Sequence, residues 1–353
     1  MVSAVRPKGI VTIADVAKLA GVSNGTVSRF NHEPERVSPA TRDKIQAAIE
    51  TLGYSPNILA RNFRTGSTGV ILVLTSGIGD PFYGDVISGI GRVARSKGYT
   101  VRIEELYDGT PLSSNDLSSF ISSRQADGIV VLGSPWPFRH SERDAGDASY
   151  AIVVCGETSD PELARYPRFQ IDGRSAAHEM TRYLIGQGHY QIGFLGVAGA
   201  TVPLVERENG YKLAMKEANI ELSPDWIADA GVTIEEARRA TTALLHTQKK
   251  PTAIICATDD IALAAMAEIH AQGLVVPRDI CVTGFDDTRY AAIANPPLTT
   301  VAQPREQIGE NAVYKLIDMM NNKPAPLREE QRQYILPHRI ILRGSSQVLA
   351  GKT

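Results

Sequence analysis

Residues that would mark a catalytic or metal site are few and ungrouped in this sequence. Three cysteines occur among 353 residues, without the C-x-x-C spacing of a redox or metal motif. The seven histidines lack metal-ligand spacing, and no nucleophile elbow, P-loop or dinucleotide-binding glycine pattern is present. We therefore expect no metal, no cofactor and no enzymatic activity.

Long apolar stretches are also missing. No segment has the roughly 20 apolar residues of a membrane span, and none reads as a secretory signal followed by a cleavage site. Cys155, Cys256 and Cys281 lie in apolar, strand-like runs, which indicates packing thiols in a reducing compartment. We expect a cytoplasmic protein without a membrane partner, long enough for two or three domains.

Three short helical patterns open the chain: "TIADVAKLAG" (12–21), "SNGTVSRF" (23–30) and "SPATRDKIQAAIETLG" (38–53). Each begins at a capping residue, and the first and third end at glycine. Asn24-Gly25 would signal a hairpin only between alternating apolar residues, which are absent, so a second helix starting after Ser23 is favoured. This arrangement is typical of a helix-turn-helix DNA-binding unit, and an unspecialised three-helix bundle is the alternative.

Glycine at position 25 is unfavourable in a helix, by about 1 kcal/mol. A close approach of the backbone to a partner would offset that cost. The glycine is therefore a first hint that this helix faces another molecule.

The segments "TIADVAKLAGVSNGTVSRF" and "RVSPATRDKIQAAIETLGYSPNILARNFRTGS" resemble the N-terminus of LacI/GalR (lactose-repressor) family transcriptional regulators. The resemblance implies a helix-turn-helix domain over residues 1–66, with a hinge helix at about 55–66 that orders on operator DNA. The DNA-contacting residues that it implies are Thr12, Ser23, Asn24, Gly25, Thr26, Ser28, Arg29, His32, Tyr54, Asn57, Ala60 and Phe63.

Asn24 and Gly25 occupy the two positions that this family uses to read major-groove bases. Asn24 can offer a bidentate amide to adenine and Arg29 a fork to guanine, whereas Gly25 offers only proximity. Phe63 stands where the family usually places a leucine wedge for the minor groove, a role that phenylalanine can also fill. The alternative is that Phe63 covers the surface of the following domain.

Asn31 replaces a residue that is usually aliphatic in the family. Either the recognition helix ends early at Asn31, or the following loop is shifted by one residue. Residues 1–66 carry a net charge of +4 and the remainder −6, as expected if only the N-terminal end meets nucleic acid, although an ordinary solvated surface is the alternative for such an excess.

From Gly69 onward, short apolar runs alternate with helical stretches such as 83–97 and 261–272. This rhythm predicts an α/β fold with doubly wound parallel sheets in two lobes, with ligands at the carboxyl ends of the strands. The runs expected to form strands are "GVILVLT", "ADGIVVLG", "AIVVCG", "QIGFLGV", "TAIICAT" and "ICVTGFD".

The segments "DPFYGDVISGI", "RENGYKLAM", "VTGFDD" and "NPPLTTVAQPREQIG" resemble the family's two-lobed, periplasmic-binding-protein-like domain. The resemblance implies an effector-binding and dimerisation domain over 67–353. Its lobes are expected at about 67–170 with 301–332, and 171–300 with 333–345. Crossings between them are expected near 169–172, 298–303 and 331–335.

The effector-contacting residues implied by this resemblance are Phe82, Tyr83, Arg207, Thr258, Asp286 and Gln303. Thr258 and Gly156 stand where the family commonly has asparagine and aspartate. Two alternatives without an effector-binding role remain open: Arg207 pairs with a surface carboxylate, and Asp286 caps a turn. Trp136, in a proline-rich loop, is a further candidate without support from the resemblance.

These observations predict a repressor that binds a pseudo-palindromic DNA operator as a homodimer or tetramer. Its effector is expected to be a small molecule, a sugar or sugar derivative, bound between the lobes. The alternative is a sugar-binding or sugar-converting α/β protein with a helical N-terminal extension.

Overall fold

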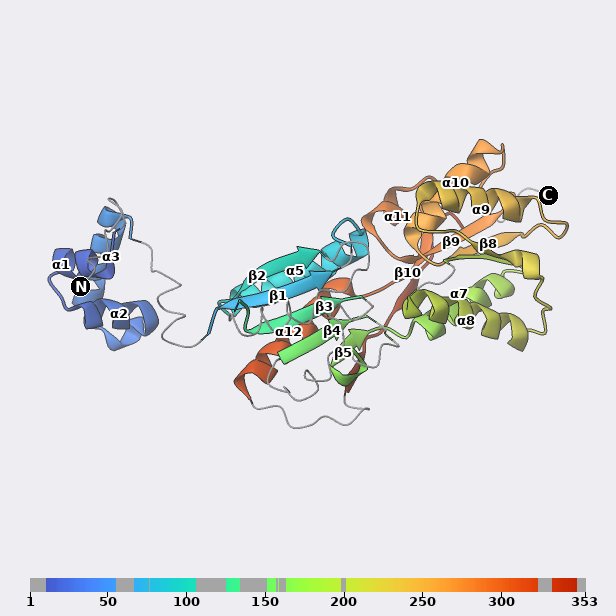
Figure 1. Cartoon of the computed structure of the whole chain (residues 1–353). Coiled ribbons are helices and arrows are strands. Elements are labelled where there is room, and N and C mark those ends of the chain that lie inside the picture. Colours follow the sequence, from blue (N-terminus) through green and yellow to red (C-terminus); the bar gives the residue numbers. More distant parts are fainter. Residues whose placement is uncertain are drawn as a thin grey trace, which may run out of the picture. The chain divides into compact units, whose positions relative to one another are not determined.

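The computed structural model describes residues 11–54, 67–75, 77–105, 125–133, 151–156, 158, 163–197, 201–322 and 332–347 (Figure 1). The chain divides into two compact units, 1–68 and 69–353. The expected hinge helix, with Asn57, Ala60 and Phe63, lies outside the described residues, and so does Trp136.

The first unit contains the predicted helix-turn-helix. Its helices are α1 (Ile13–Ala20), α2 (Asn24–His32) and α3 (Pro39–Leu52). Gly21 and Gly53 end α1 and α3 in the left-handed region, at φ 67° and 60°, a conformation that glycine adopts without strain. The buried core of this unit consists of Val16, Ala17, Ala20, Val27, Val37, Ile45 and Ala48.

The recognition helix does not end at Asn31. Helix α2 continues through this residue to His32, so the expectation of an early end is wrong. Glu33 follows with φ −143° and ψ 67°, outside the helical region that a following proline disfavours, and a short 3₁₀ turn, Pro34–Arg36, leads to α3. Asparagine inside a helix costs only a fraction of a kcal/mol, so it does not by itself end a helix.

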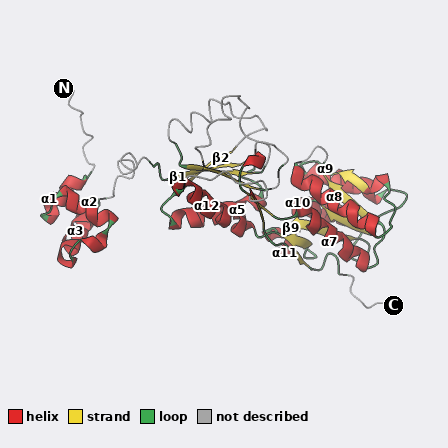
Figure 2. Ribbon diagram, turned by 90° about the horizontal axis from the view of Figure 1, so that it is seen from below, coloured by secondary structure: helices red, strands yellow, loops and turns green. Residues whose placement is uncertain are grey.

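The first lobe of the second unit is a parallel sheet. Its strand order is β11 (Gln333–Ile335), β5 (Arg168–Gln170), β4 (Ala151–Cys155), β3 (Gly128–Leu132), β1 (Val70–Thr75) and β2 (Thr100–Glu105). Helices α5 (Pro81–Ser96) and α12 (Arg305–Asn321) pack together on one face (Figure 2). Alternate residues of β1 enter two separate buried clusters, so the strand is buried on both faces.

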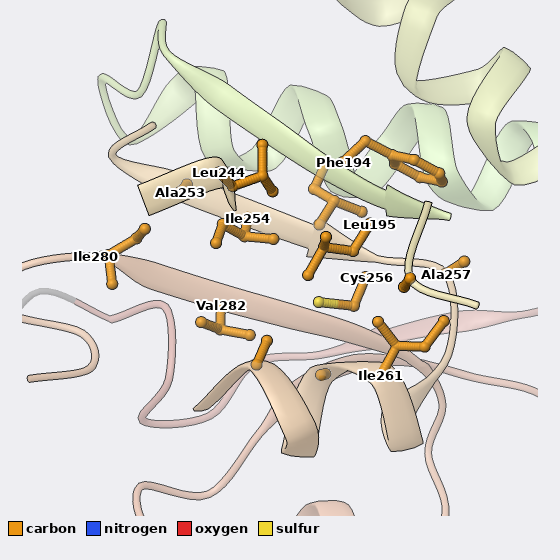
Figure 3. Close-up of a cluster of buried hydrophobic side chains, with 14 of the residues drawn as sticks. Phe194, Leu195, Leu244, Ala253, Ile254, Cys256, Ala257, Ile261, Ile280 and Val282 are labelled. Carbon is orange, nitrogen blue, oxygen red and sulfur yellow. The ribbon is translucent and has the colours of Figure 1, made fainter. Parts of the chain in front are cut away.

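The second lobe repeats this arrangement. Its strand order is β12 (Arg339–Ile341), β10 (Thr299–Ala302), β9 (Cys281–Asp286), β8 (Ala253–Cys256), β6 (Ile192–Gly196) and β7 (Ile227–Asp229). Only β12 is antiparallel to its neighbour. The main helices are α7 (Gly173–Gly186), α8 (Val202–Glu217), α9 (Ile234–Leu245) and α10 (Asp259–Ala271). Apolar side chains from β6, β8, β9 and the adjoining helices form its core (Figure 3).

All six apolar runs predicted as strands are strands: they form β1, β3, β4, β6, β8 and β9. The third crossing between the lobes lies later than expected. Residues 333–345 were assigned to the second lobe, but Gln333–Ile335 pairs with β5 in the first sheet, and the chain crosses at 336–338. Strands of three residues at a sheet edge are too short for periodicity to show which sheet they join.

Glycines bring the paired helices of each lobe into backbone contact. A Cβ atom on Gly89 of α5 would lie 2.1 Å from the carbonyl oxygen of Glu306 on α12. Gly210 of α8 would meet the carbonyl oxygen of Arg174 on α7 at the same distance. No side chain fits at either position, so the close crossing depends on glycine.

No helix in the described part of the chain is long and apolar enough to span a bilayer. The three cysteines are free and buried, and burial raises the pKa of each thiol. Such thiols are poor nucleophiles and serve as packing groups.

Candidate functional site

The start of the recognition helix is fixed by a serine cap. The Ser23 hydroxyl oxygen accepts a hydrogen bond from the Thr26 backbone N–H at 3.1 Å, so α2 begins at Asn24. Val27 of the same helix is fully buried in the core of the first unit. One side of α2 is thereby anchored, and the opposite side remains available for a partner.

Exposed positions of α2 carry residues that are expected to read bases. Asn24, Gly25 and Arg29 are exposed, whereas Thr26 and Ser28 are half-buried. An exposed amide at the start of the helix and an exposed guanidinium further along it are donors and acceptors of the kind that major-groove recognition uses. The arrangement fits the predicted roles of these residues, which stay predictions.

Gly25 is not required by the fold of this unit. A Cβ atom there would contact only the Ser23 hydroxyl oxygen, at an ordinary 3.7 Å, and φ does not lie in the left-handed region. The unfavourable glycine therefore has no explanation within the part of the chain that the structure describes.

The other described DNA-site candidates also have places in the fold. Asp15 accepts hydrogen bonds from the Thr12 backbone N–H at 2.8 Å and from its hydroxyl at 2.7 Å, which fixes the start of α1. Tyr54 is half-buried against the core of the first unit, and His32 is the last residue of α2. The structure thus gives Thr12 a capping role beside the predicted one.

In the second unit, Arg207 on α8 and Asp286 at the end of β9 form a buried ion pair. The Arg207 Nη2 atom lies 3.2 Å from Asp286 Oδ1, and their side chains are only 9% and 8% exposed. Nη1 donates to the Ala257 carbonyl oxygen, and the guanidinium stacks on the Phe285 ring at 3.7 Å. The alternative that Arg207 pairs with a surface carboxylate is wrong.

Asp286 is held in an unusual conformation. Its φ of 109° lies in the left-handed region, and Gln303 donates from Nε2 to Oδ1 at 2.7 Å. Burial raises the pKa of the Asp286 carboxyl to about 7, although Arg207 acts in the opposite direction. The structure therefore brings together three of the six expected effector residues: Arg207, Asp286 and Gln303.

Thr258 acts as a helix cap. Its hydroxyl oxygen accepts the Ile261 backbone N–H at 3.3 Å and starts α10. The next residue, Asp259, was not predicted as a site residue, although it belongs to the "CATDD" segment at a strand end. Its fully buried carboxylate accepts from the Thr300 hydroxyl and the Thr288 backbone N–H, both at 2.6 Å. Burial raises its pKa to about 6.

The first lobe supplies aromatic groups. Phe82 and Tyr83 lie in the first turn of α5, half-buried, with their rings edge to face at 5.3 Å. Asp80 caps this helix by accepting the Phe82 backbone N–H at 2.8 Å. Burial raises the pKa of Tyr83 to about 12, with smaller contributions from Asp80 and from Asp286 of the second lobe. Side chains of both lobes therefore share one electrostatic environment.

Both units match known protein families. Residues 12–57 match the family described as bacterial regulatory proteins, lacI family, and residues 181–346 match the periplasmic binding protein-like domain. The chain is 35% identical to the HTH-type transcriptional repressor CytR of Escherichia coli K12 over 340 residues, 96% of this chain and 97% of CytR. It is 30% identical to the repressor PurR of Vibrio campbellii, over 96% of this chain and all of PurR.

Solved structures agree with these relatives. A complex of the transcriptional regulator CelR with cellobiose is 27% identical, with a TM-score of 0.68, over 95% of this chain and 99% of CelR. The Lac repressor dimer bound to operator and the anti-inducer ONPF has the same fold, with a TM-score of 0.78 at 24% identity over 96% and 100% of the two chains. The chain belongs to the LacI family of bacterial regulatory proteins and is a DNA-binding transcriptional repressor.

Proposed function

We propose that this repressor binds a pseudo-palindromic operator in the cytoplasm as a dimer, under the control of a sugar or sugar derivative bound between the two lobes. The observation that carries the effector assignment is the buried group of Arg207, Asp286 and Gln303. Members of the family provide precedents: CelR has been solved with cellobiose, and the Lac repressor as a dimer on its operator.

The chemistry of this group suits a polyhydroxylated ligand. Asp286 offers acceptor oxygens and Arg207 offers donors, a pairing that matches two neighbouring hydroxyls. The Nε atom of Arg207 is buried and has no hydrogen-bond partner within the described residues. A buried donor left unpaired costs about 1–3 kcal/mol, so a ligand hydroxyl that accepts from it gains affinity.

The aromatic residues of the first lobe complete the proposed site. Phe82 would stack on the carbon face of the ligand ring, and Tyr83 lies beside it. Thr258 would contact the ligand only through side-chain atoms that are not used in the hydrogen bond that caps α10. Lobe closure around the ligand would change the spacing of the segments that lead to the hinges, and a short hinge helix amplifies such a displacement.

A calorimetric screen tests the effector assignment. Monosaccharides, disaccharides, nucleosides and sugar phosphates form the panel, and the best ligand is then titrated into Arg207→Ala and Asp286→Ala. Each variant is expected to lose at least about tenfold in affinity, or 1.4 kcal/mol, and its effector response. Operator binding without ligand should persist.

Arg238→Ala is the matched control, because Arg238 forms a surface ion pair with Glu268 in the same lobe. It should leave ligand affinity unchanged. Unaltered affinity in both site variants would refute the effector site without touching the DNA-binding assignment.

Operator selection tests the base-reading assignment. A randomised DNA library is selected with the wild type and with Asn24→Ala, and the variant should relax preference at one base pair in each half-site, by about 1–3 kcal/mol. Two half-sites are expected because one short head makes too few contacts for genomic discrimination. An identical consensus from both proteins would exclude Asn24 from readout.

A further inference from the structure

Arg305 contacts both lobes at once. It is the first residue of α12, directly after the second crossing between the lobes. On the side of the first lobe, its Nη2 and Nε atoms donate to Asp85 Oδ2 on α5 at 2.7 and 3.0 Å. On the side of the second lobe, it donates to the backbone carbonyl oxygens of Asp286 and Asp287.

The two residues whose carbonyl oxygens bind Arg305 have strained backbone conformations. Asp286 and Asp287 have φ values of 109° and 54°, both in the region that residues other than glycine rarely adopt. Such residues cost roughly 1–3 kcal/mol each and persist only where the surroundings hold them. A second arginine, Arg343, follows β12 and also binds this turn. Its Nη2 atom lies 2.7 Å from Asp287 Oδ1, and its Nη1 atom donates to the Leu298 carbonyl oxygen.

This strained pair carries the carboxylate of the proposed effector site. The direction of the Asp286 side chain follows from its backbone conformation, and both carbonyl contacts from Arg305 fall on the backbone of this pair. The guanidinium is a planar fork, so the atoms that hold the carbonyls and the atoms that hold Asp85 cannot move independently.

We propose that Arg305 is a positioning residue of the effector site: it holds the 286–287 turn in its strained conformation and, through Asp85, links that turn to the first lobe. The inference rests on the proposed effector site. It explains how a ligand on Asp286 affects the lobes, because a shift of the first lobe by about 1 Å stretches the Asp85 contact beyond hydrogen-bond length. The Arg305–Asp85 contact is thus the element that ligand binding and lobe position both bias.

The two side chains of the Arg305–Asp85 ion pair differ in exposure, and this difference allows the ion pair to break. The Arg305 side chain is 11% exposed, whereas Asp85 is 48% exposed. Water screens the ion pair to the first lobe, so it contributes little to stability and can open at low cost. The bonds to the carbonyls are better protected, and the turn keeps them when the lobes separate.

Two measurements on the full-length protein, without ligand or DNA, test the proposal. Hydrogen exchange with mass spectrometry follows the peptide 284–290, which contains the amides of the turn. Spin-label distances between cysteines introduced at the exposed Arg95 and Lys216 follow the lobes, and the buried native cysteines do not compete for label. The variants are Arg305→Gln and Asp85→Ala.

Arg305→Gln removes both links, so exchange in the turn should accelerate about tenfold and the distance distribution should broaden. Asp85→Ala removes the acceptor on the first lobe and keeps the carbonyl contacts, so it should broaden the distances while exchange stays within about threefold of wild type. Arg92→Gln is the matched control, because Arg92 on α5 pairs with Glu306 and Glu310 on α12 within one lobe. It should change neither reading.

Exchange at the wild-type rate in Arg305→Gln would overturn the positioning role. A wild-type distance distribution in Asp85→Ala would overturn the link to the first lobe, and this milder variant keeps the test valid if Arg305→Gln unfolds. Neither measurement involves effector or operator, so a negative result leaves the proposed function standing, and failure of the effector screen leaves this test intact.

Discussion

The two lobes have equivalent strand orders, but different residues occupy the equivalent turn in each lobe. Strand β4 of the first lobe occupies the place that β9 occupies in the second. At the carboxyl end of both strands the backbone enters the left-handed region: φ is 125° at Gly156 and 109° at Asp286. The fold therefore sets the turn, whereas the residue that occupies it differs.

Glycine makes this turn without strain, but aspartate needs support. Gly156 is held only by its backbone N–H, which donates to Phe169 at 3.0 Å, among the bonds seen in the described residues. Asp286 has hydrogen bonds from Arg207, Gln303 and Arg305. Two of these donors, Arg207 and Gln303, bind the carboxylate, and Arg305 binds the backbone carbonyl oxygen. A strained, buried aspartate held in this way is typical of a functional position, since stability alone would favour glycine.

The largest expected effect concerns a feature that both lobes share, the glycine-mediated helix crossing. Gly89→Ala would place a Cβ atom 2.1 Å from the backbone of α12, so the helices must separate. We expect the free energy of unfolding to fall by about 3 kcal/mol, measured by urea denaturation.

Gly91→Ala is the control for this variant. It lies two residues away on the same helix, and nothing lies within 4 Å of its added Cβ. This change should be neutral or stabilising by up to about 1 kcal/mol. Equal effects of the two substitutions would mean that the helices do not need their close crossing.

The second prediction concerns the pH dependence of the free energy of unfolding. Asp286 in the turn of the second lobe contributes to it, whereas Gly156 in the equivalent turn of the first lobe cannot. Asp286 has a pKa of about 7 in the folded protein, against an ordinary value of 3.8 for aspartate, so the folded state keeps a proton that the unfolded state has lost between about pH 4 and 7. The free energy of unfolding then falls as pH rises through this window. Asp286→Asn should remove this slope and gain about 2 kcal/mol relative to wild type between pH 5 and 8.

Denaturation curves at pH 5, 6, 7 and 8 measure this difference. Asp259 titrates in the same direction but is present in both proteins. Asp279→Asn is a control, because its neighbour Arg278 lowers the pKa of Asp279 to about 2, below the window. A relative stability of Asp286→Asn that does not change with pH would show that Asp286 is ionised throughout.

The third prediction isolates the strain of the turn itself. Gly156→Ala has room, since the nearest atoms to its added Cβ lie 3.9 Å away, but it must adopt φ near 125°. We expect a loss of about 1–2 kcal/mol in denaturation experiments. Gly186→Ala, at the end of α7 with open space and no positive φ, should not lose stability. Equal stabilities would show that the first lobe's turn is free to change conformation.

The sequence predicted the core of the fold better than its edges. Runs such as 70–75 and 281–286 are apolar throughout because both faces of the strand are buried, and this pattern is visible without a structure. The edge strands β2, β7 and β11 contain exposed residues and carry no such pattern. The third crossing was therefore placed too early.

The residues of the candidate site also fall into those that the sequence predicted and those that it missed. Family resemblance brought Arg207, Asp286 and Gln303 into one site, and the structure places them within hydrogen-bond distance. Arg305 was missed because its partners are mainly backbone carbonyls, whose positions depend on φ values that no residue type reveals. Asp259 was missed because its burial arises from contacts distant in sequence.

The smallest effect concerns Gly25, which neither a positive φ nor a close contact explains. Alanine favours a helix over glycine by up to about 1 kcal/mol, and its methyl group has space here. Gly25→Ala should therefore slow hydrogen exchange in the peptide 21–33 of the full-length protein, by about twofold to fivefold. Gly21→Ala, only four residues earlier, must adopt φ 67° and should accelerate it.

Operator binding then decides what Gly25 is for. If the glycine allows α2 to approach the base edges, its added methyl group should weaken binding to the selected operator, while non-specific, salt-dependent binding persists. Slower exchange with unchanged operator affinity would contradict that role. Together the two readings separate a residue retained for the fold, such as Gly21, from one whose cost to the helix is offset only when DNA is bound.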